Sequence, residues 1–301
     1  LSSCWCWSFG LWKKGCIMKT DRSPDTRRSK QKSDLPWHFL MLVVVVVMLY
    51  PIVFAVSTSF KTLPEVYSNS FGIIPKAPTL NAYKGVISKI PFFKITFNTF
   101  FVATLVTLFK LLTGVLAAYS FVFFDYKGKK LMYFILICTI FIPFTVTMIP
   151  NFITISRLGL KDSLLGVALP QMADATGIFL LRQHMRGIPK SLLEVAELEK
   201  TPHFTRLRTI VVPMIKPAVF SIGIIFFVNS WNEYVWPSLI IKSEANYTLS
   251  LALQMFVSAE GGVDVPMAMA TSVLTMLLPL VLYAFCQRFI IETFSQSGIK
   301  G

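Results

Sequence analysis

Few residues of this chain could do chemistry in the manner of an enzyme. The sequence has no Gly-rich phosphate-binding loop, no G-x-S-x-G or H-E-x-x-H pattern and no paired Cys motif. Its three histidines are far apart in the sequence, at His38, His184 and His203. No disulfide or zinc spacing links the five cysteines, Cys4, Cys6, Cys16, Cys138 and Cys286. We therefore predict that the chain has no catalytic residues and no metal site.

Two ionisable residues are more informative because each lies inside a long apolar run. Lys110 lies near the middle of the run 97–124, and Asp174 lies within the run 163–181. A charged group at membrane depth costs about 2.5–3.5 kcal/mol on insertion scales. Lys110 is therefore expected either to line a water-filled pathway or to pair with a carboxylate, for which Asp174 is one candidate. For Asp174, a position in the pathway or bundle interior is favoured over a helix end.

Aromatic and polar side chains alternate near the end of another apolar run. The cluster is Trp231-Asn232-Glu233-Tyr234, followed by Trp236. Aromatic faces stack on sugar rings, and amide or carboxylate groups bind hydroxyls, so Trp231, Asn232 and Glu233 are candidate substrate contacts. The alternative is an aromatic belt at the outer membrane interface, where Trp and Tyr are common. The composition of the cluster leaves both interpretations open.

The elements that must position these residues are apolar helices. Hydrophobic residues make up 54% of the 301 residues and charged residues 15%, and the mean hydropathy is +0.63. This composition excludes intrinsic disorder and argues against a soluble enzyme. About 20 apolar residues cross a bilayer as a helix. Six runs meet or approach that length and are predicted as transmembrane helices: 37–60, 97–124, 131–156, 163–181, 217–241 and 265–287.

The charges orient these six helices. The net charge is +14, and no basic helix or aromatic-basic pattern points to nucleic acid. Twenty of the 29 Lys and Arg fall on the side of the N-terminus if residues 1–36 are inside. Basic residues collect in the cytoplasm, so both termini are predicted there, with 61–96 as an outer loop and 291–301 as a cytoplasmic tail. Residues 1–17 lack a signal-peptide layout, and we expect Met18 to be the true start.

The inside segment 182–216 carries a short helix. Pro189–Thr201 is rich in helix formers, and Leu192, Val195 and Ala196 fall on one face. A helix lying on the membrane surface would present bulky anchors such as Trp or Phe, which this stretch lacks. It is acidic instead, at Glu194, Glu197 and Glu199. A protein partner therefore fits this helix better than a lipid surface does.

These residues resemble a known family. Glu194-Val195-Ala196, then Ile210 and Pro213, resembles the EAA loop of ABC importer permeases, and the chain from Trp37 to Gly301 resembles the maltose-type sugar permeases. Matching stretches include Ser59-Phe60-Lys61, Pro78–Tyr83, Asn98-Thr99, Ala118–Phe121, Met148-Ile149-Pro150, Leu158-Gly159-Leu160, Phe179–Gln183, Trp231-Asn232, Trp236-Pro237, Thr248-Leu249 and Gln287-Arg288-Phe289. The chain departs from the family pattern where Lys200 replaces the usual glycine, so the turn after this helix is expected to differ.

The resemblance implies an all-α membrane protein with the type I importer permease fold, its core spanning 97–290. It implies a second permease subunit, an ATPase dimer that binds ATP, an extracytoplasmic solute-binding protein, and sugar import across the bacterial cell membrane. ATPase coupling would rest on Leu192, Glu194, Val195, Ala196 and Glu199. The loop 242–264 would meet the binding protein, and this chain would hold no cofactor. The alternative, a secondary transporter of a small polar solute, would need inverted repeats, and the two halves have no convincing similarity.

Overall fold

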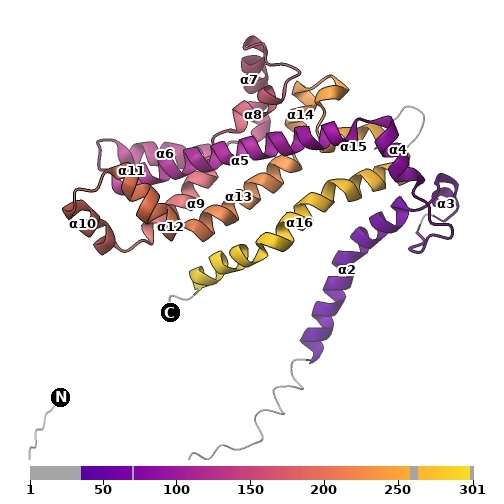
Figure 1. Cartoon of the computed structure of the whole chain (residues 1–301), viewed down its shortest axis with the longest axis horizontal. Helices are drawn as coiled ribbons and strands as arrows, with labels where there is room; N and C mark the ends of the chain where they lie inside the picture. Colours follow the sequence, from indigo (N-terminus) through magenta and orange to yellow (C-terminus); the bar gives the residue numbers. More distant parts are fainter. Residues whose placement is uncertain (1–34, 70, 258–263, 299–301) are drawn as a thin grey trace, which may run out of the picture. The chain divides into compact units, whose positions relative to one another are not determined.

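The computed structural model describes residues 35–69, 71–257 and 264–298, and all regular structure in these ranges is helical (Figure 1). The chain divides into two compact units, one ending at Ile52 and one beginning at Val53. Helix α2, Leu35–Ser59, contains the boundary between them, and only its last residues, Ser57, Thr58 and Ser59, are buried. Cys4, Cys6, Cys16, the basic tail and the expected start at Met18 lie outside the described residues.

Four helices form the centre of the second unit. Helix α5, Phe92–Phe123, packs along α9, Ala175–Arg186, and along α13, Lys216–Trp231, which also packs against α16, Val265–Gly298. Glycine permits the close approach of α9 and α13, because a Cβ at Gly177 would overlap the Phe226 ring. The core lies between these helices, and large apolar side chains such as Leu108 and Phe134 face outward. An outward apolar surface of this extent suits a bilayer.

The predicted spans differ in continuity. Among the described residues, α2, α5 and α16 are each long and apolar enough to cross a membrane. Three further segments are bent helix pairs: α6, Lys129–Ile140, with α7, Phe144–Arg157, at 99°; α8, Leu164–Ala168, and η1, Leu169–Gln171, with α9 at 47°; and His203–Met214 with α13 at 80°. The expected run 217–241 is not one helix, because α13 ends at Trp231, and His203–Met214 falls in the segment expected as an inside loop. The run 131–156 was expected as one helix, but it breaks before α7, where Pro143 lacks the N–H that a continuing helix needs.

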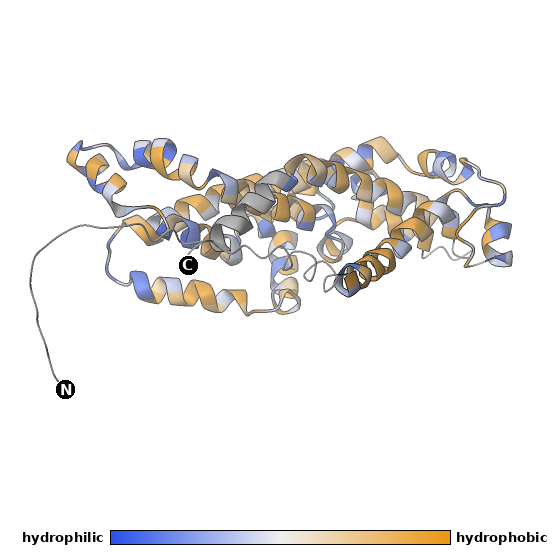
Figure 2. Cartoon of the chain, turned by 90° about the horizontal axis from the view of Figure 1, so that it is seen from below, coloured by the Kyte–Doolittle hydropathy of each residue, from blue (hydrophilic) through white to orange (hydrophobic). Residues whose placement is uncertain are grey.

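Short helices gather at the two ends of the second unit (Figure 1). One end carries α10, Lys190–Leu198, and α11, His203–Arg206, followed by the π-helical turn η2, Leu207–Val211, and α12, Val212–Met214. The other end carries α3, Leu63–Ser68; α4, Asn81–Lys89; η3, Glu244–Asn246; and α15, Leu249–Val257. Helix α14, Val235–Ile240, lies beside α7 and α8 (Figure 1). Hydrophobic residues cover the long helices, and hydrophilic residues concentrate in the turns and in some of the short helices, such as α10 (Figure 2).

Candidate functional sites

Helix α10 presents an apolar surface to the outside of the chain. Leu192, Val195 and Leu198 are exposed, Val195 by 55% and Leu198 by 84%, and Glu194 and Glu199 are exposed beside them. The structure differs from expectation at Ala196, which is only 3% exposed and therefore faces this chain instead of a partner. Leu193 packs on the core cluster that includes Leu181, Met185 and Leu207. The helix is thus held on one side by its own chain and open on the other.

The turn after α10 keeps the geometry of a glycine turn without a glycine. The Lys200 N–H donates to Glu197 O at 2.9 Å, and the Thr201 N–H donates to Ala196 O at 3.0 Å. These two bonds are the Schellman motif, which places the residue after the helix in the left-handed region. Lys200 adopts that conformation, with φ of 52°. The Lys200 replacement therefore leaves the turn intact and places strain at a single residue.

Lys110 and Asp174 are brought together. Lys110 Nζ lies 3.9 Å from Asp174 Oδ2 and 5.1 Å from the centre of the Phe226 ring, so one amino group contacts both α9 and α13. Asp174 precedes α9, and its Oδ1 accepts a hydrogen bond from the Gly177 N–H at 2.7 Å. Asp174 therefore combines an N-cap with an ion pair, at the 47° break between η1 and α9. A hollow of about 450 Å³ lies between α5, α6 and α9, and Asp174 is one of its lining residues among mainly apolar side chains.

The two tryptophans of the aromatic cluster are buried. Trp231 is fully buried, stacks on Phe227 at 5.8 Å and donates its Nε1–H to Thr275 O at 3.0 Å. Trp236 donates its Nε1–H to Val167 O at 3.1 Å. Trp231 therefore packs in the core of this chain, and its ring is not exposed. Glu233 accepts a hydrogen bond from the Trp236 N–H at 3.3 Å at the start of α14.

Asn232 lines a hollow that the sequence did not reveal. The hollow is about 450 Å³ in volume and lies between the end of α13 and helices α15 and α16. Its lining carries no charged residue: Asn232, Tyr234, Ser250, Gln254, Ser272 and Thr275 supply a few polar atoms beside Leu253 and Met276, and most of the surface exposed to the hollow is apolar. Within the described ranges, the Asn232 and Gln254 amides have no hydrogen-bond partner. Amides donate and accept, so these two can bind hydroxyl groups. We call this cavity the polar hollow.

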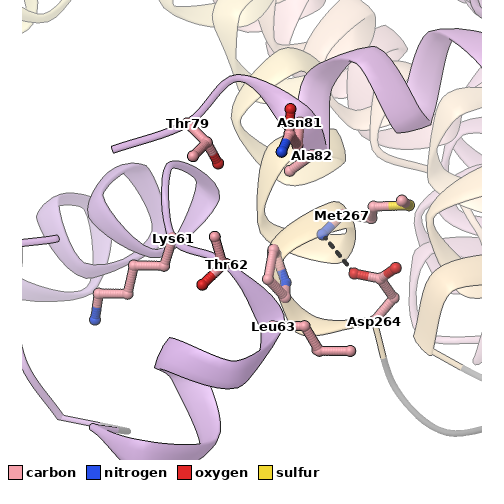
Figure 3. A pocket seen from close by; sticks show the side chains of 9 residues that line it. Lys61, Thr62, Leu63, Thr79, Asn81, Ala82, Asp264 and Met267 are labelled. Atoms are coloured by element: carbon pink, nitrogen blue, oxygen red, sulfur yellow. Dashed lines mark hydrogen bonds between the residues drawn. The ribbon is translucent and has the colours of Figure 1, made fainter. Parts of the chain in front are cut away.

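A smaller hollow of about 200 Å³ lies near α3, α4 and α16 (Figure 3). Its two charged residues are already engaged. The Asp264 carboxylate accepts a hydrogen bond from the Met267 N–H at 3.2 Å and lies 3.8 Å from Lys89 Nζ. Lys61 points away from the hollow, and its Nζ donates to Gly72 O. This cavity offers mainly the side chains of Thr62, Thr79 and Asn81 to a ligand.

The model for the binding-protein-dependent transport system inner membrane component matches residues 110–294, more than half of the chain. The chain belongs to this family. It is therefore a transport permease, with multiple apolar helices in the inner membrane, and residues 110–294 include Lys110, Asp174, α10 and the polar hollow.

Relatives of this permease align over almost their whole length. The sn-glycerol-3-phosphate transport system permease protein UgpE of Pectobacterium atrosepticum is 28% identical over 267 residues, covering 86% of this chain and 95% of the relative. The arabinooligosaccharides transport system permease protein AraQ of Halalkalibacterium halodurans is 24% identical, covering 86% and 93%.

Solved structures share the fold of the permease. A chain of a bacterial ABC transporter involved in import of the acidic polysaccharide alginate superposes with a TM-score of 0.77 at 22% identity, covering 88% of this chain and 99% of that chain. A chain of the alginate transporter in complex with its alginate pentasaccharide-bound periplasmic protein has a TM-score of 0.64 at 14% identity, covering 86% and 94%.

Sequence reasoning missed a carboxylate of this permease that organises the expected outer side. Asp162 Oδ1 accepts hydrogen bonds from the Lys242 N–H at 3.0 Å and from the Ser243 N–H at 3.0 Å and Oγ–H at 2.9 Å. The backbone N–H bonds from Ser243 and Lys242 lower the pKa of Asp162 to about 2. The bonds join positions about 80 residues apart, so no local pattern announced them. The nearest signal in the sequence was a lone Asp in the short segment between the apolar runs 131–156 and 163–181. The structure gives Asp162 a positive φ of 54°.

Proposed function

We propose that this permease is one of two membrane subunits of an ATP-driven importer for a sugar or related solute. An extracytoplasmic binding protein delivers the solute, and a dimer of ATPase subunits binds ATP and docks on α10. Both termini lie in the cytoplasm, and this chain has no enzymatic activity and no cofactor of its own. The family supports this proposal, as do the relatives named for glycerol phosphate and arabinooligosaccharides.

One observation carries the docking of the ATPase. Helix α10 exposes Leu192, Val195 and Leu198 while Leu193 and Ala196 hold it against the chain. An apolar row on an anchored helix, with the Glu194 carboxylate beside it, fits a groove with a basic rim. The partner face is therefore Leu192, Glu194, Val195, Leu198 and Glu199, and Ala196 positions that face without contacting the ATPase.

The test separates these two roles. Val195→Asp and Glu194→Lys are expected to leave the permease inserted and to abolish copurification of the ATPase, because the first places an unmatched carboxylate in an apolar contact and the second places a cation against the proposed basic rim. Ala196→Asp is expected to lower the yield of folded permease, since it places a carboxylate at a buried position. Ile74→Asp is the control, because Ile74 is 81% exposed in the expected outer loop. Normal ATPase binding by both α10 variants would refute the docking proposal.

The polar hollow is the proposed solute contact in this subunit. Its uncharged lining fits a neutral polyhydroxylated solute better than a phosphate or a uronate, both of which would call for a cation. Gln254→Leu is therefore expected to reduce uptake of a neutral oligosaccharide at least about tenfold, corresponding to about 1.4 kcal/mol. Binding of the same sugar to the isolated binding protein would be unchanged. Ile225→Leu on the outward surface of α13 is the control.

Energy source separates the importer from a secondary transporter. Uptake into vesicles containing the whole complex should require ATP inside and stop with vanadate. Uptake driven by an ion gradient without the ATPase would support the alternative.

Roles for Lys110 and Asp174 follow from their geometry: we propose that the pair is structural and holds the break before α9, and that neither residue touches solute.

A further inference from the structure

Helix α5 differs from the bent spans of the second unit. It runs from Phe92 to Phe123 without a break or an internal proline. Side-chain hydrogen bonds tie it to other segments near each end, and the residues that make them, Asn98, Thr99 and Tyr119, are all buried. Twenty residues separate Thr99 from Tyr119, which corresponds to about 30 Å of helix, the thickness of a bilayer core.

The first tie joins α5 to the segment that follows α10. Tyr119 Oη lies 3.3 Å from His203 Nδ1 and donates to His203 O at 3.3 Å. The His203 ring lies 4.5 Å from the Phe124 ring. His203 is the first residue of α11, directly after the turn that ends α10, and Arg206 Nε closes that turn by donating to Thr201 O at 2.7 Å. Movement of α10 therefore reaches His203 through only a few fixed residues.

The second tie joins α5 to the helix that lines the polar hollow. Thr99 Oγ1 accepts a hydrogen bond from the Leu249 N–H at 2.8 Å, at the first residue of α15. Asn98 Nδ2 donates to Ala245 O and to Tyr247 O, each at 3.1 Å. Ser250, Leu253 and Gln254 of α15 line the polar hollow. A shift of α5 is thus passed to the residues that face the solute.

We propose that α5 is a strut that transmits displacement of α10 to α15 and the polar hollow, with Tyr119 and His203 as the positioning residues at one end and Asn98 and Thr99 at the other. The strut rests on the proposed function, because it needs ATPase docking on α10. It acts in parallel with the covalent route through η2 and α13, which is bent by 80°. An unbroken helix carries displacement more faithfully than a bent one.

The chain supplies matched variants that remove one polar atom each. Tyr119→Phe removes the hydroxyl that meets His203, and Thr99→Val removes the acceptor for the Leu249 N–H. Tyr133→Phe and Thr104→Val are their controls, because within the described residues those two hydroxyl oxygens are buried and have no hydrogen-bond partner. Thr104 lies on α5 itself, so its variant also tests helix disruption. Thr99→Ser, which keeps the hydroxyl, is the rescue variant.

The readout is a cysteine at position 253, introduced as Leu253→Cys after replacement of the native cysteines, because Leu253 lines the polar hollow and is not one of the proposed hydrogen-bonding contacts. The whole importer is reconstituted in vesicles, and labelling by a membrane-impermeant thiol reagent is compared with and without ATP plus vanadate. We expect nucleotide to change the labelling rate at least about fivefold in the reporter parent. We expect Tyr119→Phe and Thr99→Val each to reduce that ratio about twofold or more, with ATPase binding intact.

Combining the variants tests whether the two ties act in series. For one strut, Tyr119→Phe with Thr99→Val should be no worse than the stronger single variant, whereas independent effects would multiply. Multiplied effects, an unchanged ratio in either single variant, or equal loss in the controls would overturn the strut. No nucleotide response in the reporter parent would instead count against the proposed function.

Discussion

Lys200 illustrates how one residue can carry the cost of a turn. The Schellman hydrogen bonds hold it at φ of 52°, a conformation that costs a non-glycine residue about 1–2 kcal/mol. The family pattern suggested that Lys200 would change this turn. The structure instead retains the turn, and the strain lies in the backbone φ of Lys200. The replacement therefore concerns stability near α10 more than shape.

We predict that Lys200→Gly stabilises the end of α10 by about 1 kcal/mol, because glycine adopts positive φ without steric strain. In this variant, amide hydrogen exchange at positions 200 and 201 should slow by roughly fivefold, the factor that corresponds to about 1 kcal/mol. Glu199→Gly is the control, since Glu199 has φ of −74° and no strain to relieve. Faster exchange in Lys200→Gly would contradict the prediction.

The lowered pKa of Asp162 predicts that acid destabilises the turn that its carboxylate holds. Its folded-state pKa of about 2 lies below the unfolded value of about 3.9, so the ionised carboxylate stabilises the structure above about pH 4. That stabilisation is lost as the pH falls from about 4 through 2. The protection factors of the Lys242 and Ser243 amides, which compare their exchange with that of the unfolded chain at the same pH, should therefore fall in this window. In Asp162→Asn, exchange should be faster at neutral pH and show no such step; a step of the same size there would assign the acid response to another group.

At the scale of elements, close backbone packing sets the position of α8. A Cβ at Gly166 would overlap the carbonyl oxygen of Leu160, and the Gly166 N–H donates to Ser163 Oγ at 3.0 Å. The backbone of the turn before α8 cannot yield as a side chain would. This turn also carries Asp162, so the seating of α8 and the position of the segment after α14 depend on each other.

We predict that Gly166→Ala destabilises the permease by about 1–3 kcal/mol through overpacking. The thermal unfolding midpoint of the purified protein measures the loss. Gly187→Ala is the milder comparison, because its new methyl would meet His184 O at 3.3 Å, a tight contact that a shift of a few tenths of an ångström relieves. An unchanged midpoint in Gly166→Ala would show that the turn can shift.

The elements also show what a sequence can and cannot predict. Apolar runs located the long helices, because burial in a bilayer requires about 20 apolar residues regardless of neighbours. The buried side of Ala196 depended on packing against other segments of the chain. The break at Pro143 has a local cause, the missing N–H, but membrane helices also tolerate proline as a kink, so the sequence did not decide between a kink and a break. The pairing of Lys110 with Asp174 was foreseen as one candidate, since a membrane-embedded cation needs a partner. The polar hollow was not foreseen, because its members come from the end of α13 and from α15 and α16, and only Asn232 and Tyr234 belonged to a recognisable cluster.

At the scale of the whole molecule, orientation is the remaining prediction. With both termini in the cytoplasm, a reporter enzyme active only outside should work when inserted in 242–257 and fail when inserted in 200–206. The excess of Lys and Arg in the segments assigned to the inside is the physical reason. The opposite pattern of activity would invert the topology and would place α10 on the wrong side for an ATPase.

Helix α2 has a consequence for the modularity of the chain. Its most apolar stretch has no buried side chain, and the residues up to Ile52 form a unit of their own. Within its own unit, hydropathy and length therefore constrain residues 35–52 more than side-chain packing does. We predict that an unrelated apolar helix of equal length, grafted before Val53, supports normal folding of the remainder, as measured by the thermal unfolding midpoint of the purified protein. A lowered midpoint would assign specific side-chain contacts to the first helix, whereas an unchanged one would make it a membrane anchor whose sequence can diverge.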